Sequence, residues 1–236
     1  FAERCCQYHG AASARGVNDI GNSSAKPARW ATSNQVPDSP TKKVVVTYSI
    51  VTGSAVTHAG QTMAAISDGT FIGSTTQAVI REATESWNDT CGVIMTFASS
   101  GGQIVIGGAS FPGGQAGLGG FSATSSDNVK WAITDGFVQL DTTDQAWTTS
   151  TLRAVCAHEV GHALGLNHTD KSDALMFPTV NSAIGPTADD RWYNQFLYGA
   201  SVPKITATMN ANGTVALSIE KGSPIQTGTT STDTFD

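Results

Sequence analysis

HEVGHALGLNH, residues 158–168, holds three histidines and a glutamate within one short stretch. Side chains four positions apart lie on the same face of a helix, so His158 and His162 can present their imidazole nitrogens to a single metal ion. Glu159 then lies beside that ion. The spacing therefore predicts a metal site on a helix, with a carboxylate next to the metal.

The second half of the same stretch predicts a sharp turn after the helix. Gly165 is the residue type that ends a helix in a left-handed conformation, and the turn brings His168 back toward the first two histidines. Three neutral imidazoles leave the fourth position of a tetrahedral zinc ion open to water, which is typical of a catalytic rather than a structural site.

The composition excludes several classes of protein. The chain has 236 residues, of which 39% are apolar and 14% charged, so it can bury a substantial core and is not expected to be disordered. The 13 Lys and Arg against 19 Asp and Glu give a net charge of -6, which disfavours nucleic-acid binding. No apolar stretch approaches the roughly 18 residues of a membrane span. Low charge and 25 glycines favour a secreted protein.

Hydrophobic periodicity around the motif predicts five strands and three helices. The strands are expected at 42–51, 93–98, 103–108, 117–122 and 131–141. The first helix is expected to start after Ser74 or Thr75, to include Trp87 and to stop by Gly92. The second helix covers 150–164, and the third starts at Pro186 and ends before Gly199.

The chain divides into three parts on these signals. Residues 1–40 are predicted to be an extended arm, either a propeptide or an extension held by disulfides. Residues 41–200 form the domain that contains the motif. Residues 201–236 are predicted to contain a β-hairpin around Asn212-Gly213, either as a tail or as the start of a further β module.

The motif resembles the long zinc signature of metzincin metallopeptidases, and SDALMFP, which places Met176 beneath the metal, resembles their Met-turn. KPARW, VTYSIV and DDRWYNQFLYG are similar to parts of the matrixin branch, the matrix metalloproteinases. The resemblance implies a zincin-like α/β domain whose twisted sheet is mostly parallel, with one antiparallel edge strand. It implies a cleft between a larger N-terminal and a smaller C-terminal subdomain, with zinc at its floor.

The resemblance also implies an activity, that of a secreted zinc endopeptidase acting on extended protein or peptide substrates, and we expect a monomer. Glu159 would be the general base and acid. Substrate would pair with the edge strand near Gly117, Leu118 and Gly119. Pro178 and Val180, together with Ile184, would line a pocket for an apolar residue after the scissile bond.

Departures from the matrixin pattern concern the other metals. Gly120 and Gln139 stand where matrixins usually carry histidine ligands, so no second, structural zinc is expected. Asp141 and Asp144 are candidate calcium ligands, with solvated carboxylates as the alternative. Thr169 follows the third histidine in place of the residues that the better-known branches have there.

The four cysteines leave two interpretations open. Cys5 and Cys6 could both bridge to Cys91 and Cys156, or Cys91 could pair with Cys156 while an arm thiolate occupies the open position on zinc. The second arrangement would be a latent zymogen. A catalytically silent binding or adhesion module is the remaining alternative, and the retained Glu159 argues against it.

Overall fold

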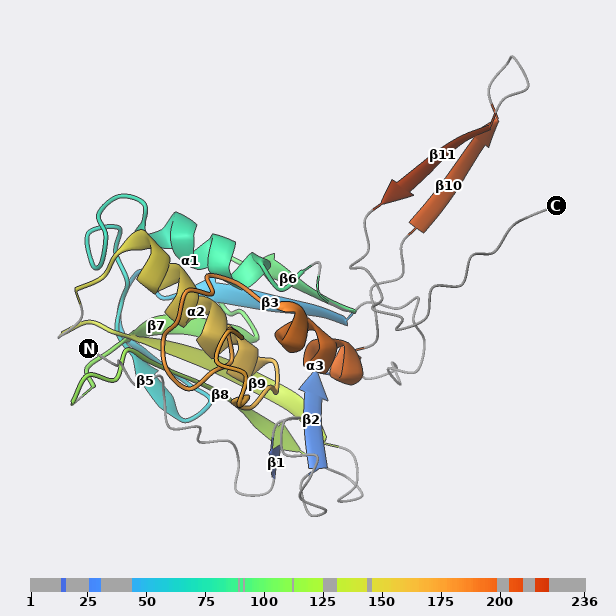
Figure 1. Cartoon of the computed structure of the whole chain (residues 1–236). Helices are drawn as coiled ribbons and strands as arrows, with labels where there is room; N and C mark the ends of the chain where they lie inside the picture. Colours follow the sequence, from blue (N-terminus) through green and yellow to red (C-terminus); the bar gives the residue numbers. More distant parts are fainter. Residues whose placement is uncertain are drawn as a thin grey trace.

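The computed structural model describes residues 14–15, 26–30, 44–88, 90, 92–111, 113–124, 131–143, 146–198, 204–209 and 215–220. A seven-stranded sheet forms its centre, in the order β1-β2-β9-β7-β3-β6, with β8 on the other edge of β9 (Figure 1). All of its strand pairs are parallel except β8 with β9. The sheet is mixed and mostly parallel, which confirms the predicted α/β class.

The strands of this sheet are mostly those that the periodicity predicts. They are β1 (Ala14–Arg15), β2 (Lys26–Trp30), β3 (Val44–Ile50), β6 (Val93–Phe97), β7 (Ile104–Ala109), β8 (Gly117–Thr124) and β9 (Trp131–Asp141).

The prediction of five strands was wrong, because β1 and β2 come from the segment expected to be an arm. β2 pairs with the start of β9, from Ala28 opposite Trp131 to Trp30 opposite Ile133. β7 pairs with the same edge of β9 from Gly136 onward, so β2 and β7 lie end to end along one long strand. The sheet therefore begins before the predicted boundary at residue 41.

Three helices accompany the sheet, namely α1 (Thr76–Glu85), α2 (Thr149–Ala163) and α3 (Ala188–Tyr198). α1 and α2 lie side by side on one face of the sheet, and α2 packs against β8 and β9 (Figure 1). α1 ends before Trp87, contrary to the prediction. The buried Trp87 indole instead donates a hydrogen bond to Ala157 O of α2 at 3.0 Å, which joins the two helices.

The opposite face of the sheet is covered by a small hairpin that was not predicted, β4 (Val56–His58) and β5 (Gln61–Met63). Both residues of its turn have positive φ, 50° at Ala59 and 78° at Gly60. Alanine rarely adopts that conformation, so the sequence carries no strong hairpin signal here. Gln139 of β9 donates to Thr62 O at 2.9 Å and anchors the hairpin.

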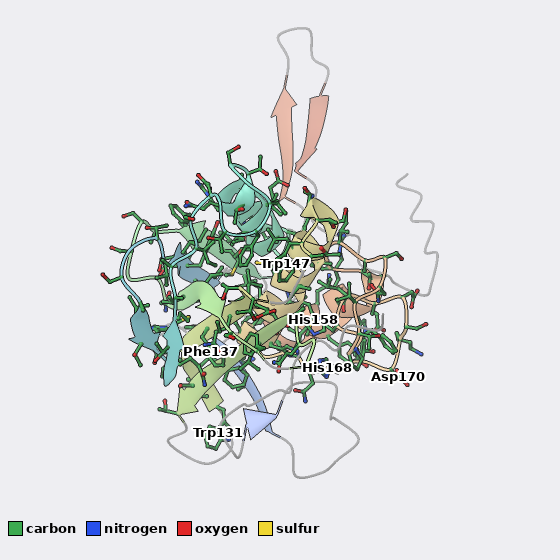
Figure 2. All side chains as sticks on the ribbon, turned by 90° about the vertical axis from the view of Figure 1, so that its left-hand side faces the viewer. Trp131, Phe137, Trp147, His158, His168 and Asp170 are labelled. Atoms are coloured by element: carbon green, nitrogen blue, oxygen red, sulfur yellow. The ribbon has the colours of Figure 1, made fainter. Side chains whose placement is uncertain are left out.

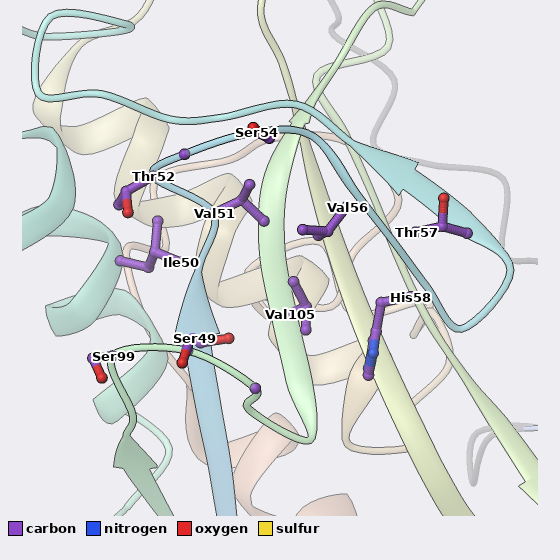
Figure 3. A pocket seen from close by; sticks show the side chains of 13 residues that line it. Ser49, Ile50, Val51, Thr52, Ser54, Val56, Thr57, His58, Ser99 and Val105 are labelled. Atoms are coloured by element: carbon purple, nitrogen blue, oxygen red, sulfur yellow. The ribbon is translucent and has the colours of Figure 1, made fainter.

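A cavity of about 480 Å³ lies between this hairpin, the end of β3 and the loop from β6 to β7 (Figure 3). Its lining includes hydroxyl and apolar side chains, among them Ser49, Val51, Val56 and Ser99. None of the residues of the 158–168 motif lines it.

The C-terminal part contains the predicted hairpin. β10 (Lys204–Met209) and β11 (Val215–Glu220) pair antiparallel as a separate two-stranded sheet, with Lys204 opposite Glu220. Within the described residues, no helix has both the length and the apolar character of a membrane-spanning segment.

Candidate metal centre and active site

The three histidines of the motif converge as the spacing predicts. His162 Nε2 lies 3.1 Å from His158 Nε2 and 3.3 Å from His168 Nε2. Figure 2 shows His158 and His168 close to each other. In the part of the chain that the structure describes, this is the one group of three or more His, Cys, Asp or Glu side chains whose ligand atoms lie close enough to hold a metal ion.

The other ring nitrogens fix which atoms face the metal position. His158 Nδ1 donates to Leu175 O at 2.6 Å, and His162 Nδ1 donates to Leu166 O at 2.8 Å. A carbonyl oxygen can only accept, so the proton of each neutral ring sits on Nδ1, and Nε2 carries the lone pair that can bind a metal.

Burial keeps these imidazoles neutral. Loss of solvation on burial, together with the neighbouring His168, lowers the pKa of His158 to about 3. Burial also lowers the pKa of His162. It lowers the pKa of His168 as well, although that side chain is only partly buried. Neutral imidazole is the form that ligates metals, so the cluster is in its binding form at pH 7.

Gly165 makes the predicted turn. Its φ is +97°, and its amide donates to His162 O at 2.9 Å. The next amide, that of Leu166, donates to Gly161 O at 3.0 Å, which completes the usual pair of hydrogen bonds at a glycine-ended helix. The turn reverses the chain so that His168 faces the helix.

The predicted Met-turn lies directly beneath the helix. Met176 is buried, and a Cβ added to Gly161 would collide with its sulfur. Asp190 of α3 holds this segment, since its carboxylate accepts hydrogen bonds from the amides of Leu175 (2.9 Å) and Met176 (3.0 Å). In the sequence, Asp190 has only the signature of a helix start, an acidic residue in the first turn of α3, which gives no sign of this role.

Glu159 is completely buried on α2, next to the edge strand β8. A Cβ on Gly119 would collide with the Glu159 carbonyl, and one on Gly117 would lie 2.9 Å from Glu159 Cγ. These two glycines were predicted to allow a substrate backbone to approach. In the structure they allow the helix itself to approach β8, which brings the Glu159 carboxylate close to the edge strand.

Beside His158, the structure has a cavity of only about 10 Å³. Val180 lines it, together with α2 residues that include Val155. Pro178 and Ile184 do not line it, and the Ile184 side chain is 46% exposed.

Residues 42–199 match the family model described as Matrixin. The chain belongs to the matrixin family. This match confirms the resemblance inferred from the zinc signature and the Met-turn. It also makes zinc the metal that the family implies for the histidine cluster.

Similar matrixins come from animals and a plant. Stromelysin-3 of Xenopus laevis is 45% identical over 67 residues, covering 25% of this chain and 14% of that protein. Matrix metalloproteinase-19 of Homo sapiens is 32% identical over 147 residues, covering 56% and 27%. Metalloendoproteinase 2-MMP of Arabidopsis thaliana is 37% identical over 68 residues, covering 28% and 16%. The chain thus matches much less than half the length of these relatives.

The three nitrogens fit the zinc of a matrixin. Zn–N bonds of about 2.0–2.1 Å in a tetrahedral site place neighbouring ligand atoms roughly 3.3–3.4 Å apart. The observed separations of 3.1 and 3.3 Å agree with that spacing before any adjustment of the side chains. The neutral rings and their Nδ1 hydrogen bonds also suit the same ion.

The residues considered for other matrixin metals have structural contacts. Asp141 is buried, and its Oδ1 accepts from the amide of Phe111 (3.2 Å) and the hydroxyl of Thr143 (2.9 Å), which organises two loops. Asp144 lies outside the described residues. Gln139 anchors the β4–β5 hairpin, and Gly120 pairs with Phe137 on the neighbouring strand.

Cys156 is a free, buried thiol in the structure, so neither predicted pairing that uses it is formed. Its Sγ faces Ile80 O of α1 at 3.8 Å, away from the histidines. Burial raises the pKa of this thiol to about 12. Cys5, Cys6 and Cys91 lie outside the described residues.

Proposed function

We propose that this matrixin domain is a secreted zinc-dependent endopeptidase in which Glu159 is the general base. The observation that carries the proposal is the convergence of three neutral imidazole Nε2 atoms, 3.1 and 3.3 Å apart, on the helix that also carries Glu159. A binding scaffold has no need of a carboxylate beside the metal, whereas hydrolysis does.

The histidines, Glu159 and Met176 would have different roles in peptide hydrolysis. His158, His162 and His168 would hold a zinc ion, which would supply the Lewis acidity needed to polarise a peptide carbonyl and activate water near neutral pH. Glu159 takes the proton from the attacking water and delivers it to the nitrogen of the departing amine. Met176 packs under the ligands and takes no part in the chemistry.

The substrate would lie as an extended strand along β8, which is the antiparallel edge strand of the sheet. β8 pairs with β9 on one side, and β-strand addition on the other would use main-chain groups of Gly117, Leu118 and Gly119. Side-chain selectivity would come from the cavity lined by Val180. A cavity of about 10 Å³ favours a small residue, alanine or glycine, directly after the scissile bond.

Secretion is supported by the composition, since only 14% of the residues are charged and 25 are glycine. The two alternatives are a latent form with Cys5 or Cys6 on the metal and a silent binding module. Calcium binding at Asp141 is a further proposal. The ion would compete for the carboxylate, whose Oδ1 accepts the hydrogen bonds from Phe111 and Thr143.

The deciding experiment is digestion of a peptide library by the wild-type chain and by Glu159→Ala, read by mass spectrometry at matched zinc occupancy. We expect cleavage by the wild type alone, blocked by a chelator, with small residues after the scissile bond. Equal cleavage by both proteins would contradict the role of Glu159. Silence from both, with zinc bound, would favour latency or a binding module.

A further inference from the structure

The C-terminal end of α2 needs partners from outside the helix. The last four carbonyls of any helix have no acceptor role within it. In α2 the first two of these carbonyls are satisfied by the Gly165 turn described above. The other two belong to Ala163, the last residue of α2, and to Leu164, its C-cap residue, and because both are buried each needs a donor from another part of the protein.

Trp30 of β2 and Tyr198 of α3 supply these donors. Trp30 Nε1 donates to Ala163 O at 2.9 Å, and the Tyr198 hydroxyl donates to Leu164 O at 2.6 Å. The same hydroxyl accepts from the Trp30 amide at 3.1 Å, which joins the two donors to each other. Both side chains are buried. We call Trp30 and Tyr198 the carbonyl clamp.

The clamp lies where the chain turns from one metal ligand to the next. β2 also contacts the turn directly, because a Cβ on Gly165 would lie 2.5 Å from Ala28 O. Immediately after Gly165, Leu166 O accepts the hydrogen bond that orients His162. His168 follows two residues later. A shift of the clamped carbonyls would therefore move both the acceptor of His162 and the backbone of His168.

We propose that Trp30 and Tyr198 are positioning residues for the metal centre, acting through the end of α2. They touch neither metal nor substrate. Groups behind metal ligands set ligand orientation, and their loss typically weakens metal binding by 10–100-fold. The proposal rests on the metal-binding part of the proposed function and extends it to β2 and to the end of α3, which the motif does not include.

Two conservative substitutions test the clamp, and the chain offers a matched control for each. Tyr198→Phe removes one hydroxyl whose hydrogen bond is 2.6 Å long, and Tyr48→Phe removes a hydroxyl that donates to Glu85 of α1 at the same distance. Trp30→Phe removes an indole donor at 2.9 Å, and Trp147→Phe removes one that donates to Asp141 O at the same distance.

The measurement is zinc affinity by competition with a chelator, together with the visible spectrum of the Co²⁺-substituted protein. A cooperative unfolding transition of each metal-free protein shows that the variant is folded. If Trp30→Phe does not fold, Tyr198→Phe alone tests the clamp, because it keeps the aromatic ring and removes only the hydroxyl. We expect the zinc Kd to rise about tenfold in Tyr198→Phe and Trp30→Phe, with an altered cobalt spectrum. We expect no change of either in the two controls.

Equal zinc Kd values and spectra in all the folded variants would overturn the proposal. A rise of the same size in the controls would also overturn it, because general loss of stability would then explain the effect. These readouts do not depend on peptide cleavage. A clamp effect in a protein that cleaves nothing would leave the proposal standing and contradict the proposed function, whereas a wild type that binds neither ion would contradict both.

Discussion

At its N-terminal end α2 is capped by its own residues, whereas at its C-terminal end two of its carbonyls are capped by residues far away in the sequence. Thr148 and Thr151 form a reciprocal capping box, in which the Thr148 side chain accepts from the Thr151 amide at 3.1 Å. Trp30 and Tyr198 do the equivalent work at the other end. The end that carries metal ligands is thus the one tied to the rest of the domain, so its geometry depends on the whole fold.

The largest expected effect is the gain in unfolding free energy on zinc binding, which should depend on the C-terminal end of α2 and not on its N-terminal end. In the proposed site, His158 and His162 of α2 and His168 after it would bind zinc only in the folded chain, so free zinc at about 1,000 times its Kd should stabilise the protein by roughly 4 kcal/mol. Urea unfolding with zinc and with chelator measures this gain. His162→Ala should abolish the gain, and Thr148→Ala should keep it. A gain that survives His162→Ala would place the metal elsewhere.

Gly119→Ala tests the region between the two ends of α2, where β8 contacts the middle of the helix. The added Cβ would collide with the Glu159 backbone, which cannot move aside, so we expect a loss of about 3 kcal/mol in unfolding free energy and loss of activity. Gly117→Ala is the control. Its Cβ would meet the side chains of Glu159 and Val155 at 2.9 Å, which can adjust. Equal losses in stability would contradict this account.

Thr148→Ala isolates the locally capped end. Loss of the side-chain acceptor should lower the unfolding free energy by about 1 kcal/mol. The zinc Kd should stay at its wild-type value, because no metal ligand or ligand-orienting group lies at that end. Chelator competition on Thr148→Ala measures it, and a raised Kd would remove the distinction between the two ends.

The smallest effect is expected at the cavity beside the first half of α2. Val180→Ala would enlarge the cavity of about 10 Å³ and admit longer apolar residues after the scissile bond. Stability should change by less than about 0.5 kcal/mol, since Val180 is only partly buried. Library digestion by the variant reads the preference. An unchanged cleavage profile would show that this cavity does not select the substrate.

Local signals explain what the sequence could predict. The spacing of His158 and His162, the left-handed Gly165 and the return of His168 all depend on residues within one helix and one turn. The alternation in 131–141 and the Gly-rich edge strand are local as well. These are the elements that the structure reproduces, and together they contain every metal ligand.

Contacts between distant residues explain what the sequence could not predict. KPARW has no alternation of its own, and β2 exists because β9 offers an edge about a hundred residues later. Asp190 has the sequence signature of an ordinary helix start, yet it holds the amides of Leu175 and Met176. Gly117 and Gly119 have a second role that no local pattern predicts, because their lack of a Cβ lets α2 approach β8 at Glu159.

The carbonyl clamp also has a consequence for the order in which the chain folds. Its two members, Trp30 and Tyr198, stand 168 positions apart in the sequence and are joined by the hydrogen bond from the Trp30 amide to the Tyr198 hydroxyl. A chain emerging from the ribosome can form α2 and its capping box as soon as residue 163 is free, but it cannot close the clamp before residue 198 has appeared. If the clamp positions the metal centre as proposed, that centre would reach its final geometry only after residue 198 has been synthesised.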